Sequence, residues 1–156
     1  MDLDLDAADE AFRTEARDWL AAHVPAVPLP SLETADGFAA HREWEATLAA
    51  DRWSVVSWPE EFGGRGGSLL RWLVFEEEYY GAGAPGRVSQ NGINLLAPTL
   101  FEHGTAEQLA RILPATARGE VIWAIRMLSG PLSIRAAPAN MDAPLGFSLS
   151  GAPCLG

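Results

Sequence analysis

Apolar side chains recur every three or four positions along most of the chain, which is the pattern of helices that bury one face. One such stretch spans residues 12–23 and ends before Pro25 and Pro28, because proline cannot continue a helix. A second spans residues 38–51. A third spans residues 69–80 and stops at a glycine-rich segment. These spacings predict helices separated by short breaks.

The same pattern continues beyond the glycine-rich segment. Residues 93–101 form a fourth apolar stripe, and Thr105 with Gln108 has the spacing of a capping box at the start of a fifth helix. We expect Pro114 to interrupt that helix and a short further turn to reach Gly119. Residues 1–118 are therefore predicted to be one helical domain of about five or six helices.

The chain changes character after residue 118. Its only charged residues from there on are Glu120, Arg126, Arg135 and Asp142. Residues 121–125 are typical of a buried strand, and 133–136 and 146–151 are weaker strand candidates. Such short strands are too few for a stable sheet of their own. We interpret residues 119–156 as the truncated start of a β-domain, which makes the whole chain mainly α with an incomplete β segment.

Composition excludes several classes of partner. The chain has 156 residues and a net charge of −10, and all 11 of its basic residues are arginine. No basic face for nucleic acid or for an anionic membrane is indicated, and no apolar run is long enough for membrane insertion. The single cysteine, Cys154, cannot form an intrachain disulfide. These features predict a cytoplasmic protein.

The most distinctive local sequence is Trp-Pro-Glu-Glu-Phe-Gly-Gly-Arg-Gly-Gly at residues 58–67. Trp58-Pro59 cannot continue a helix, and Ser68 is suited to cap the helix that follows. A P-loop is excluded because the chain contains no lysine, and the glycine spacing does not fit a dinucleotide fingerprint. From these residues alone, a structural turn and a ligand-contacting loop both stay possible.

The carboxylates and tryptophans suggest structure more readily than catalysis. Glu76, Glu77 and Glu78 are adjacent on a helix and cannot converge on one substrate, so a solvated face is the simpler interpretation. Glu60 and Glu61 are suited to hold a helix end or an arginine. Four tryptophans could line an apolar crevice or pack in a core. They are Trp44, Trp53, Trp58 and Trp72.

The histidines do not form a metal site by spacing. His23, His41 and His103 are far apart in the sequence and have no cysteine nearby. His23 and His103 lie near predicted helix ends, where histidine interacts favourably with terminal carbonyls. No complete set of catalytic residues is present, so we assign no catalytic residue and no metal ligand.

In order and spacing, several segments together resemble the N-terminal half of the flavin-dependent acyl-CoA dehydrogenases. They are Trp53, the 58–67 loop, Gly104 to Gln108, Leu113-Pro114 and Gly119 to Ala124. The resemblance implies an N-terminal helical domain, a middle β-domain and a C-terminal helical domain that carries the catalytic glutamate. It also implies FAD as cofactor and acyl-CoA as substrate, oxidised between Cα and Cβ, with the helical domain walling the acyl pocket.

The resemblance also assigns candidate cofactor contacts. In relatives, a Ser/Thr-Glu-Pro segment follows the first middle-domain strand and approaches the flavin. Here Ser129 and Pro131 match that segment, Gly130 replaces the glutamate, and the Ala-Gly-Ser-Asp portion is missing. We carry over Leu128 and Ser129 as flavin contacts and expect this chain to hold FAD poorly.

These expectations lead to one main interpretation and two alternatives. In the first, the chain is an acyl-CoA dehydrogenase-like oxidoreductase, truncated and inactive alone, that forms a homo- or hetero-oligomer with acyl-CoA dehydrogenase subunits. In the second, it is a non-catalytic helical subunit that partners a full-length homologue. An unrelated small helical protein is the third possibility.

Overall fold

The computed structural model describes residues 5–126 and 133–137 and is mainly helical, as the apolar spacing predicts. The helices are α1 (Ala7–His23), α2 (Ala35–Ala50), α3 (Leu69–Gly81), α4 (Ala97–His103) and α5 (Ala106–Ala117). The 3-10 turn η1 (Glu60–Phe62) and the π-helical turn η2 (Gly92–Leu96) lie between them. Two strands follow, β1 (Ile122–Arg126) and β2 (Ser133–Ala137).

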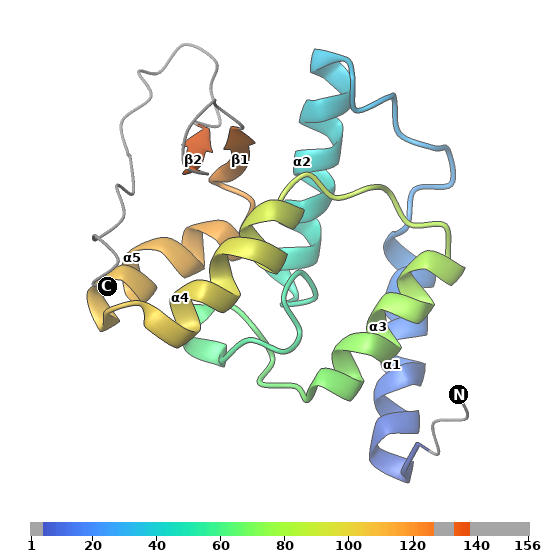
Figure 1. Cartoon of the computed structure of the whole chain (residues 1–156). Coiled ribbons are helices and arrows are strands. Elements are labelled where there is room, and N and C mark those ends of the chain that lie inside the picture. The colour runs from blue at the N-terminus through green and yellow to red at the C-terminus, as the bar shows by residue number, and fades with distance from the viewer. Residues whose placement is uncertain (1–4, 127–132, 138–156) are drawn as a thin grey trace.

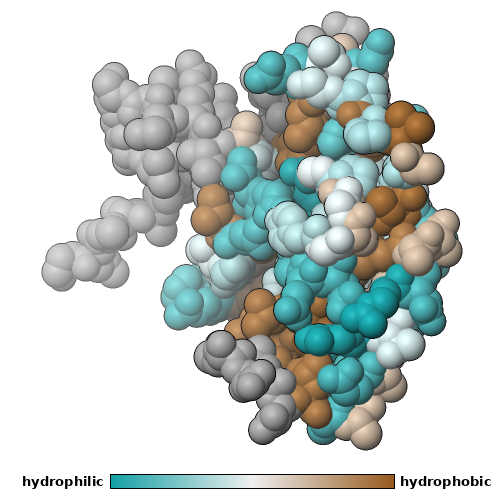
Figure 2. All heavy atoms as spheres, turned by 90° about the vertical axis from the view of Figure 1, so that its right-hand side faces the viewer, coloured by the Kyte–Doolittle hydropathy of each residue, from teal (hydrophilic) through white to brown (hydrophobic). Residues whose placement is uncertain are grey.

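Helices α1 and α3 lie side by side and run parallel (Figure 1). Three arginine–carboxylate ion pairs join the two helices, in the same order along each. Asp9 pairs with Arg71, Arg13 with Glu77, and Arg17 with Glu78, each at 2.8 Å. Figure 2 looks onto this side of the molecule and shows apolar side chains interrupted by polar ones. Opposite charges thus fix the register of two helices that are far apart in the sequence.

The core consists of two clusters joined by one short segment. The first cluster is formed by α1, α2 and α3 around Trp53, and the second by η2, α4, α5 and β1 around Trp58. Trp53 and Val56 belong to the first cluster, whereas Val55 and Trp58 belong to the second. The segment 53–58 therefore lies between the clusters and supplies large side chains to both.

Polar caps define where the helices begin. Ser68 accepts a hydrogen bond from Arg71 N, as predicted. Thr105 accepts from Gln108 N while the Gln108 side chain accepts from Thr105 N, so the predicted capping box is confirmed. Asp6 caps α1 through Asp9 N. These side chains satisfy backbone donors that have no partner within the helix.

Helix α5 does not stop at Pro114, and the expected interruption is wrong. The helix continues to Ala117, and Pro114 lies inside it. A proline removes one intrahelical hydrogen bond, but the flanking Leu113 and Ala117 are both buried in the second cluster. Their burial offsets the lost bond, so tertiary packing overrides the local preference.

Beyond α5 the chain turns through Gly119 into a β-hairpin. Strand β1 pairs antiparallel with β2, with Trp123 opposite Ala136 and Ile125 opposite Ile134. The predicted strands at 121–125 and 133–136 are confirmed to within a residue, and each is the other's partner. The third candidate, residues 146–151, lies outside the described residues. No helix within the described ranges is long and apolar enough to cross a membrane.

Candidate functional site

The glycine loop forms a compact turn that uses its own backbone donors. Every backbone N–H from Phe62 to Gly67 donates to a carbonyl oxygen between Val56 and Glu60. A side chain at Gly64 would place its Cβ only 2.0 Å from the Trp58 carbonyl oxygen, so the loop folds tightly onto itself. Because these N–H groups are engaged, the backbone of residues 62–67 has no free donors to cradle a phosphate.

A groove of about 190 Å³ lies between this loop and the helical segment that contains η2. Trp58 enters it from the loop, Trp72 from α3 and Ile93 from η2. The two polar residues in the lining are Ser57 and Asn94, and Leu69 at the rim is 76% exposed. The remaining lining residues are Val55 and Pro98. The lining thus mixes aromatic and alkyl side chains with polar groups, a combination that ligand sites commonly use.

Aromatic contacts hold the indole walls of this groove in place. The Trp58 ring meets Phe101 edge-on, with ring centroids 5.4 Å apart. The Trp72 ring lies 6.2 Å from Phe75, and the Arg87 guanidinium lies 5.4 Å from the Trp72 centroid. Cation–π and edge-on contacts both favour fixed ring orientations, so the groove is preformed.

The side chain of Arg87 is buried next to the Trp72 ring. Its guanidinium pairs with Glu76 at 2.8 Å and lies 4.0 Å from the centroid of the Tyr79 ring. The side chain is almost fully buried, as paired arginines in aromatic surroundings can be. Arg87 therefore joins α3 to the loop that precedes η2 and so supports one side of the groove.

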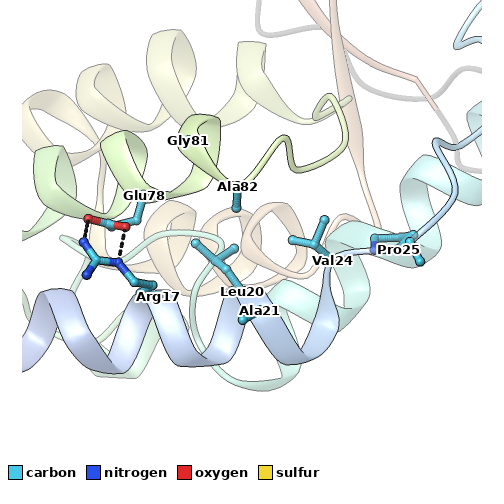
Figure 3. A pocket seen from close by; sticks show the side chains of 9 residues that line it. Arg17, Leu20, Ala21, Val24, Pro25, Glu78, Gly81 and Ala82 are labelled. Atoms are coloured by element: carbon cyan, nitrogen blue, oxygen red, sulfur yellow. Dashed lines mark hydrogen bonds and ion pairs between the residues drawn. The ribbon is translucent and has the colours of Figure 1, made fainter.

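A larger open groove, of about 620 Å³, lies where α1 and α3 end (Figure 3). Leu20, Val24 and Ala82 form its apolar lining, and Arg17 and Glu78 stand at one end, bonded to each other. The Glu78 carboxylate raises the pKa of Arg17 above its usual value through this hydrogen-bonded pair. The Arg17 and Glu78 side chains are thus bonded to one another at this end of the groove.

A third groove, of about 360 Å³, lies between α2 and the turn after α5. Its charged rim includes Arg118 and Glu120, which form a two-fold hydrogen-bonded pair at 2.7 and 3.0 Å. Hydrogen bonding to Arg118 lowers the pKa of Glu120 below its usual value. This exposed pair is structural, so the tryptophan-lined groove is the better candidate site.

The glutamates of α3 do not converge, as predicted, but the solvated-face interpretation is wrong for two of them. Glu76 pairs with Arg87 and Glu78 with Arg17, and both carboxylates are largely buried. Glu77 pairs with Arg13 and is exposed. Spacing along one helix cannot show this, because the partner arginines come from α1 and a later loop. Glu60 does hold an arginine, Arg52, at 3.0 Å.

The tryptophans and histidines have mixed placements. Trp44 and Trp53 are core residues, whereas Trp58 and Trp72 also line the groove.

The His23 Nδ1 atom lies 2.8 Å from the Trp19 carbonyl oxygen near the end of α1, as expected for a histidine at a helix terminus. Buried His41 lies between the carbonyl oxygens of Gly86 and Pro30. Within residues 5–126 and 133–137, no group of histidine, cysteine or acidic residues could hold a metal ion.

The flavin contacts assigned by resemblance cannot be placed, because Leu128 and Ser129 lie outside the described residues, as does Cys154. The hydroxyl of Ser54 donates to Ala117 O at 2.8 Å, and that of Thr116 donates to Ile112 O at 2.9 Å. Both hydroxyls therefore bond to backbone carbonyls of the helical unit.

Sequence reasoning missed Ile93 as a groove residue, and it missed Asn94 and Leu69 too. The apolar spacing places Ile93 in a buried stripe and gives no indication of a role for Asn94. Both residues lie in η2, and no local sequence pattern indicates the wide turn of this helix. The high exposure of Leu69 depends on tertiary structure and cannot be read from its spacing.

Comparison with known proteins gives a consistent result. Residues 6–120 match the family model described as acyl-CoA dehydrogenase, N-terminal domain. Acyl-CoA dehydrogenase IpdE1 of Mycolicibacterium smegmatis is 39% identical over 121 residues, which is 73% of this chain and 31% of that protein. Acyl-CoA dehydrogenase FadE26 of Mycobacterium tuberculosis is 40% identical over 85 residues, which is 54% of this chain and 21% of that protein.

Solved structures share the fold. The ChsE4–ChsE5 complex from Mycobacterium tuberculosis has a TM-score of 0.65 at 23% identity, covering 88% of this chain and 49% of that one. The Tcur3481–Tcur3483 steroid ACAD has a TM-score of 0.63 at 22% identity, with the same coverage. The chain thus spans about a third of the length of IpdE1, about a fifth of FadE26 and about half of these solved chains.

Proposed function

Because this chain belongs to the acyl-CoA dehydrogenase family, we propose that its helical unit forms one wall of an acyl-CoA cleft. The enzyme would be a flavin-dependent oxidoreductase that introduces a double bond between Cα and Cβ of the acyl group. The observation that carries the proposal is the preformed groove between the glycine loop and η2, with indole walls from Trp58 and Trp72.

The groove supplies binding and exclusion of water rather than chemistry. Trp72 and the exposed Leu69 present ring and alkyl surface that an acyl chain would cover, whereas Trp58 and Ile93 are each only 6% exposed. Each methylene buried on binding contributes roughly 0.8 kcal/mol. Ser57 and Asn94 are the polar side chains among these, and the Asn94 amide nitrogen already donates to Gln90 Oε1. We expect them to orient the ligand, since a few placed polar groups set specificity in an apolar site.

Flavin, when bound, supplies the hydride acceptor, and Leu128 and Ser129 stay our proposed contacts for it. The resemblance places the catalytic glutamate in a later domain of relatives, so the 156 residues alone are expected to be inactive. A purified sample of these residues, given acyl-CoA and an artificial electron acceptor, should show no turnover. Measurable turnover would contradict this part of the proposal. The proposed location is cytoplasmic.

A chimera tests the groove directly. Residues 6–120 would replace the matching segment of the Mycolicibacterium smegmatis relative, and retained flavin absorbance would show that the chimera folds. Leu69→Gln and Asn94→Leu change exposed groove residues and leave the core intact. If each change costs about 1 kcal/mol of acyl binding, KM for a given acyl-CoA should change about fivefold.

The matched control for the chimera is Ala21→Leu, which alters the groove at the ends of α1 and α3. It should leave KM and the acyl-chain preference unchanged. Equal effects of the control and the two groove variants would overturn the assignment of the acyl wall to the tryptophan-lined groove.

Exposed apolar residues favour a second candidate, a non-catalytic helical subunit of a larger acyl-CoA dehydrogenase assembly. Leu69 and Leu73 of α3 and Leu95 of η2 are exposed although they are large and apolar. Such surface is suited to burial against a partner subunit, here a full-length homologue. Co-expression with that homologue and size-exclusion chromatography would detect the complex, and a colourless chain that elutes alone would argue against it.

A further inference from the structure

The helix that borders the groove begins with an unusual wide turn. In η2 the Ala97 N–H donates to the Gly92 carbonyl oxygen, five residues earlier, instead of four as in an α-helix. Such π-helical turns are rare and often occur at functional sites. The extra residue per turn changes which side chains face the groove and which face the rest of the protein.

Gly92 opens this turn because nothing larger fits there. A Cβ at position 92 would lie 2.6 Å from Trp123 Cδ1 and 2.7 Å from Thr116 Cγ2. Both distances are far below a normal contact, so the glycine lets the indole of Trp123 lie directly against the helix backbone. Strand β1 therefore contacts the helical unit at the first residue of η2.

Polar contacts fix Trp123 in this position. Its indole Nε1 donates to Thr116 Oγ1 at 3.0 Å, and the Thr116 hydroxyl donates in turn to Ile112 O at 2.9 Å. The Asn91 side chain donates to the Trp123 carbonyl oxygen at 3.2 Å. Trp123 is 6% exposed and Thr116 is 1% exposed, so the bond between these two side chains is shielded from water.

The next residues of the same turn face the candidate site. Ile93 and Asn94 line the tryptophan-lined groove. One short π-helical turn thus contacts β1 through Gly92 and the groove through its two following residues. Strand β1 leads into residues 127–132, where the family resemblance places the flavin contacts.

We infer that Thr116 and Gly92 are positioning residues that seat Trp123 and thereby fix strand β1 relative to the groove. The identity of the ligand in the groove rests on the proposed function, whereas the packing of Trp123 does not. Because Trp123 packs against Gly92, a shift of strand β1 would also move Ile93 and Asn94.

Thr116→Val tests the seat because valine keeps the shape of threonine and removes only the hydroxyl. In a 15N-labelled sample of the 156 residues, the Trp123 indole N–H resonance and the Asn94 side-chain amide resonance should both shift. Amide hydrogen exchange at Ile122 to Ala124 should become about tenfold faster, because a shielded hydrogen bond is lost. Exchange within α1 and α3 should stay unchanged.

Two further variants separate positioning from general stability. Thr116→Ser restores the hydroxyl and should return the resonances and the exchange rates toward those of the parent. Thr47→Val is the matched control, since Thr47 makes the same bond to a carbonyl four residues earlier without touching Trp123. If Thr116→Val folds poorly, Trp123→Phe removes the same indole bond and leaves Thr116 bonded to Ile112.

The results that would overturn the inference are specific. An Asn94 resonance that stays in place while the Trp123 resonance shifts would show that the strand and the groove are not coupled. Equal effects of Thr47→Val and Thr116→Val would show that only a local helical bond matters. The measurement needs no acyl-CoA, so its failure is distinct from failure of the proposed acyl wall.

Discussion

Trp44 donates its indole hydrogen bond to the hydroxyl of Tyr79 at 2.6 Å in the middle of the first core cluster. The same hydroxyl donates to the Pro85 carbonyl oxygen at 2.6 Å. This chain of two bonds joins α2, α3 and the loop that follows α3. Buried polar groups of this kind are costly to leave without a partner.

Tyr79→Phe should therefore destabilise the protein. The change leaves the Trp44 N–H and the Pro85 carbonyl without their partner, and a buried unsatisfied group costs about 1–3 kcal/mol. Urea unfolding followed by tryptophan fluorescence measures the change in the free energy of unfolding. Tyr80→Phe is the matched control, because Tyr80 is 67% exposed and should change that free energy by less than about 0.5 kcal/mol. Equal losses in the two variants would contradict the role of the bonds.

Tyr79 also predicts how stability responds to alkali. Burial raises the pKa of Tyr79 above the ordinary tyrosine value of 10.0. Above that ordinary value the unfolded chain releases the Tyr79 proton before the folded chain does, so the free energy of unfolding should fall as pH rises. Below it, this contribution is complete and constant.

The alkaline prediction is checked with Tyr80→Phe, which leaves Tyr79 as the sole tyrosine. Its phenolate absorbance should appear only at a pH above 10.0, the ordinary tyrosine value. In the same sample, far-ultraviolet circular dichroism reports whether the helices survive. Phenolate absorbance near the ordinary value, in a sample that is still folded, would contradict the burial argument.

Gly119 turns the chain from α5 into β1 next to a buried carboxylate. Its φ is +64°, and an added Cβ would lie 3.2 Å from Glu45 Oε2. Gly83 has the same φ of +64° but nothing within 4 Å of an added Cβ. Gly83→Ala should thus cost only the backbone strain, about 1–2 kcal/mol, and Gly119→Ala should cost more in thermal unfolding experiments. Equal losses of unfolding free energy in the two variants would show that the Glu45 side chain moves aside without a cost.

Gly64 tests the compact glycine loop. A side chain there would meet the Trp58 carbonyl oxygen at 2.0 Å, and the backbone on both sides is hydrogen-bonded. Gly64→Ala should destabilise the protein by about 3 kcal/mol or more, because the loop must open to admit it. Gly81→Ala, at a site with open space at the end of α3, should be neutral or stabilising. Circular dichroism melting compares the two.

Much of the fold follows from local patterns in the sequence. Ser68 and the Thr105–Gln108 capping box begin helices as predicted, because their hydrogen bonds are made within a few residues. Predictions failed where the deciding partner is distant. Pro114 stays inside α5 because of tertiary burial, and Glu76 is buried because Arg87 reaches it from a later loop.

The candidate site was harder to predict than the fold, for a related reason. The sequence indicates Trp58 and Trp72 as possible lining residues, because large rings occur in crevices as well as in cores. Asn94 faces the groove from η2, a wide turn that packs against Trp123 about thirty positions further along the chain. A contact between residues so far apart in the chain does not affect the local sequence pattern around residue 94.

The alternation of residues 53–58 between the two core clusters has a consequence for how the protein melts. Trp53 and Val55 are two positions apart in the chain yet belong to different clusters. Neither cluster can lose its packing without pulling side chains of this shared segment out of the other. Fluorescence and calorimetry should accordingly report one cooperative, all-or-none transition rather than separate melting of the two halves.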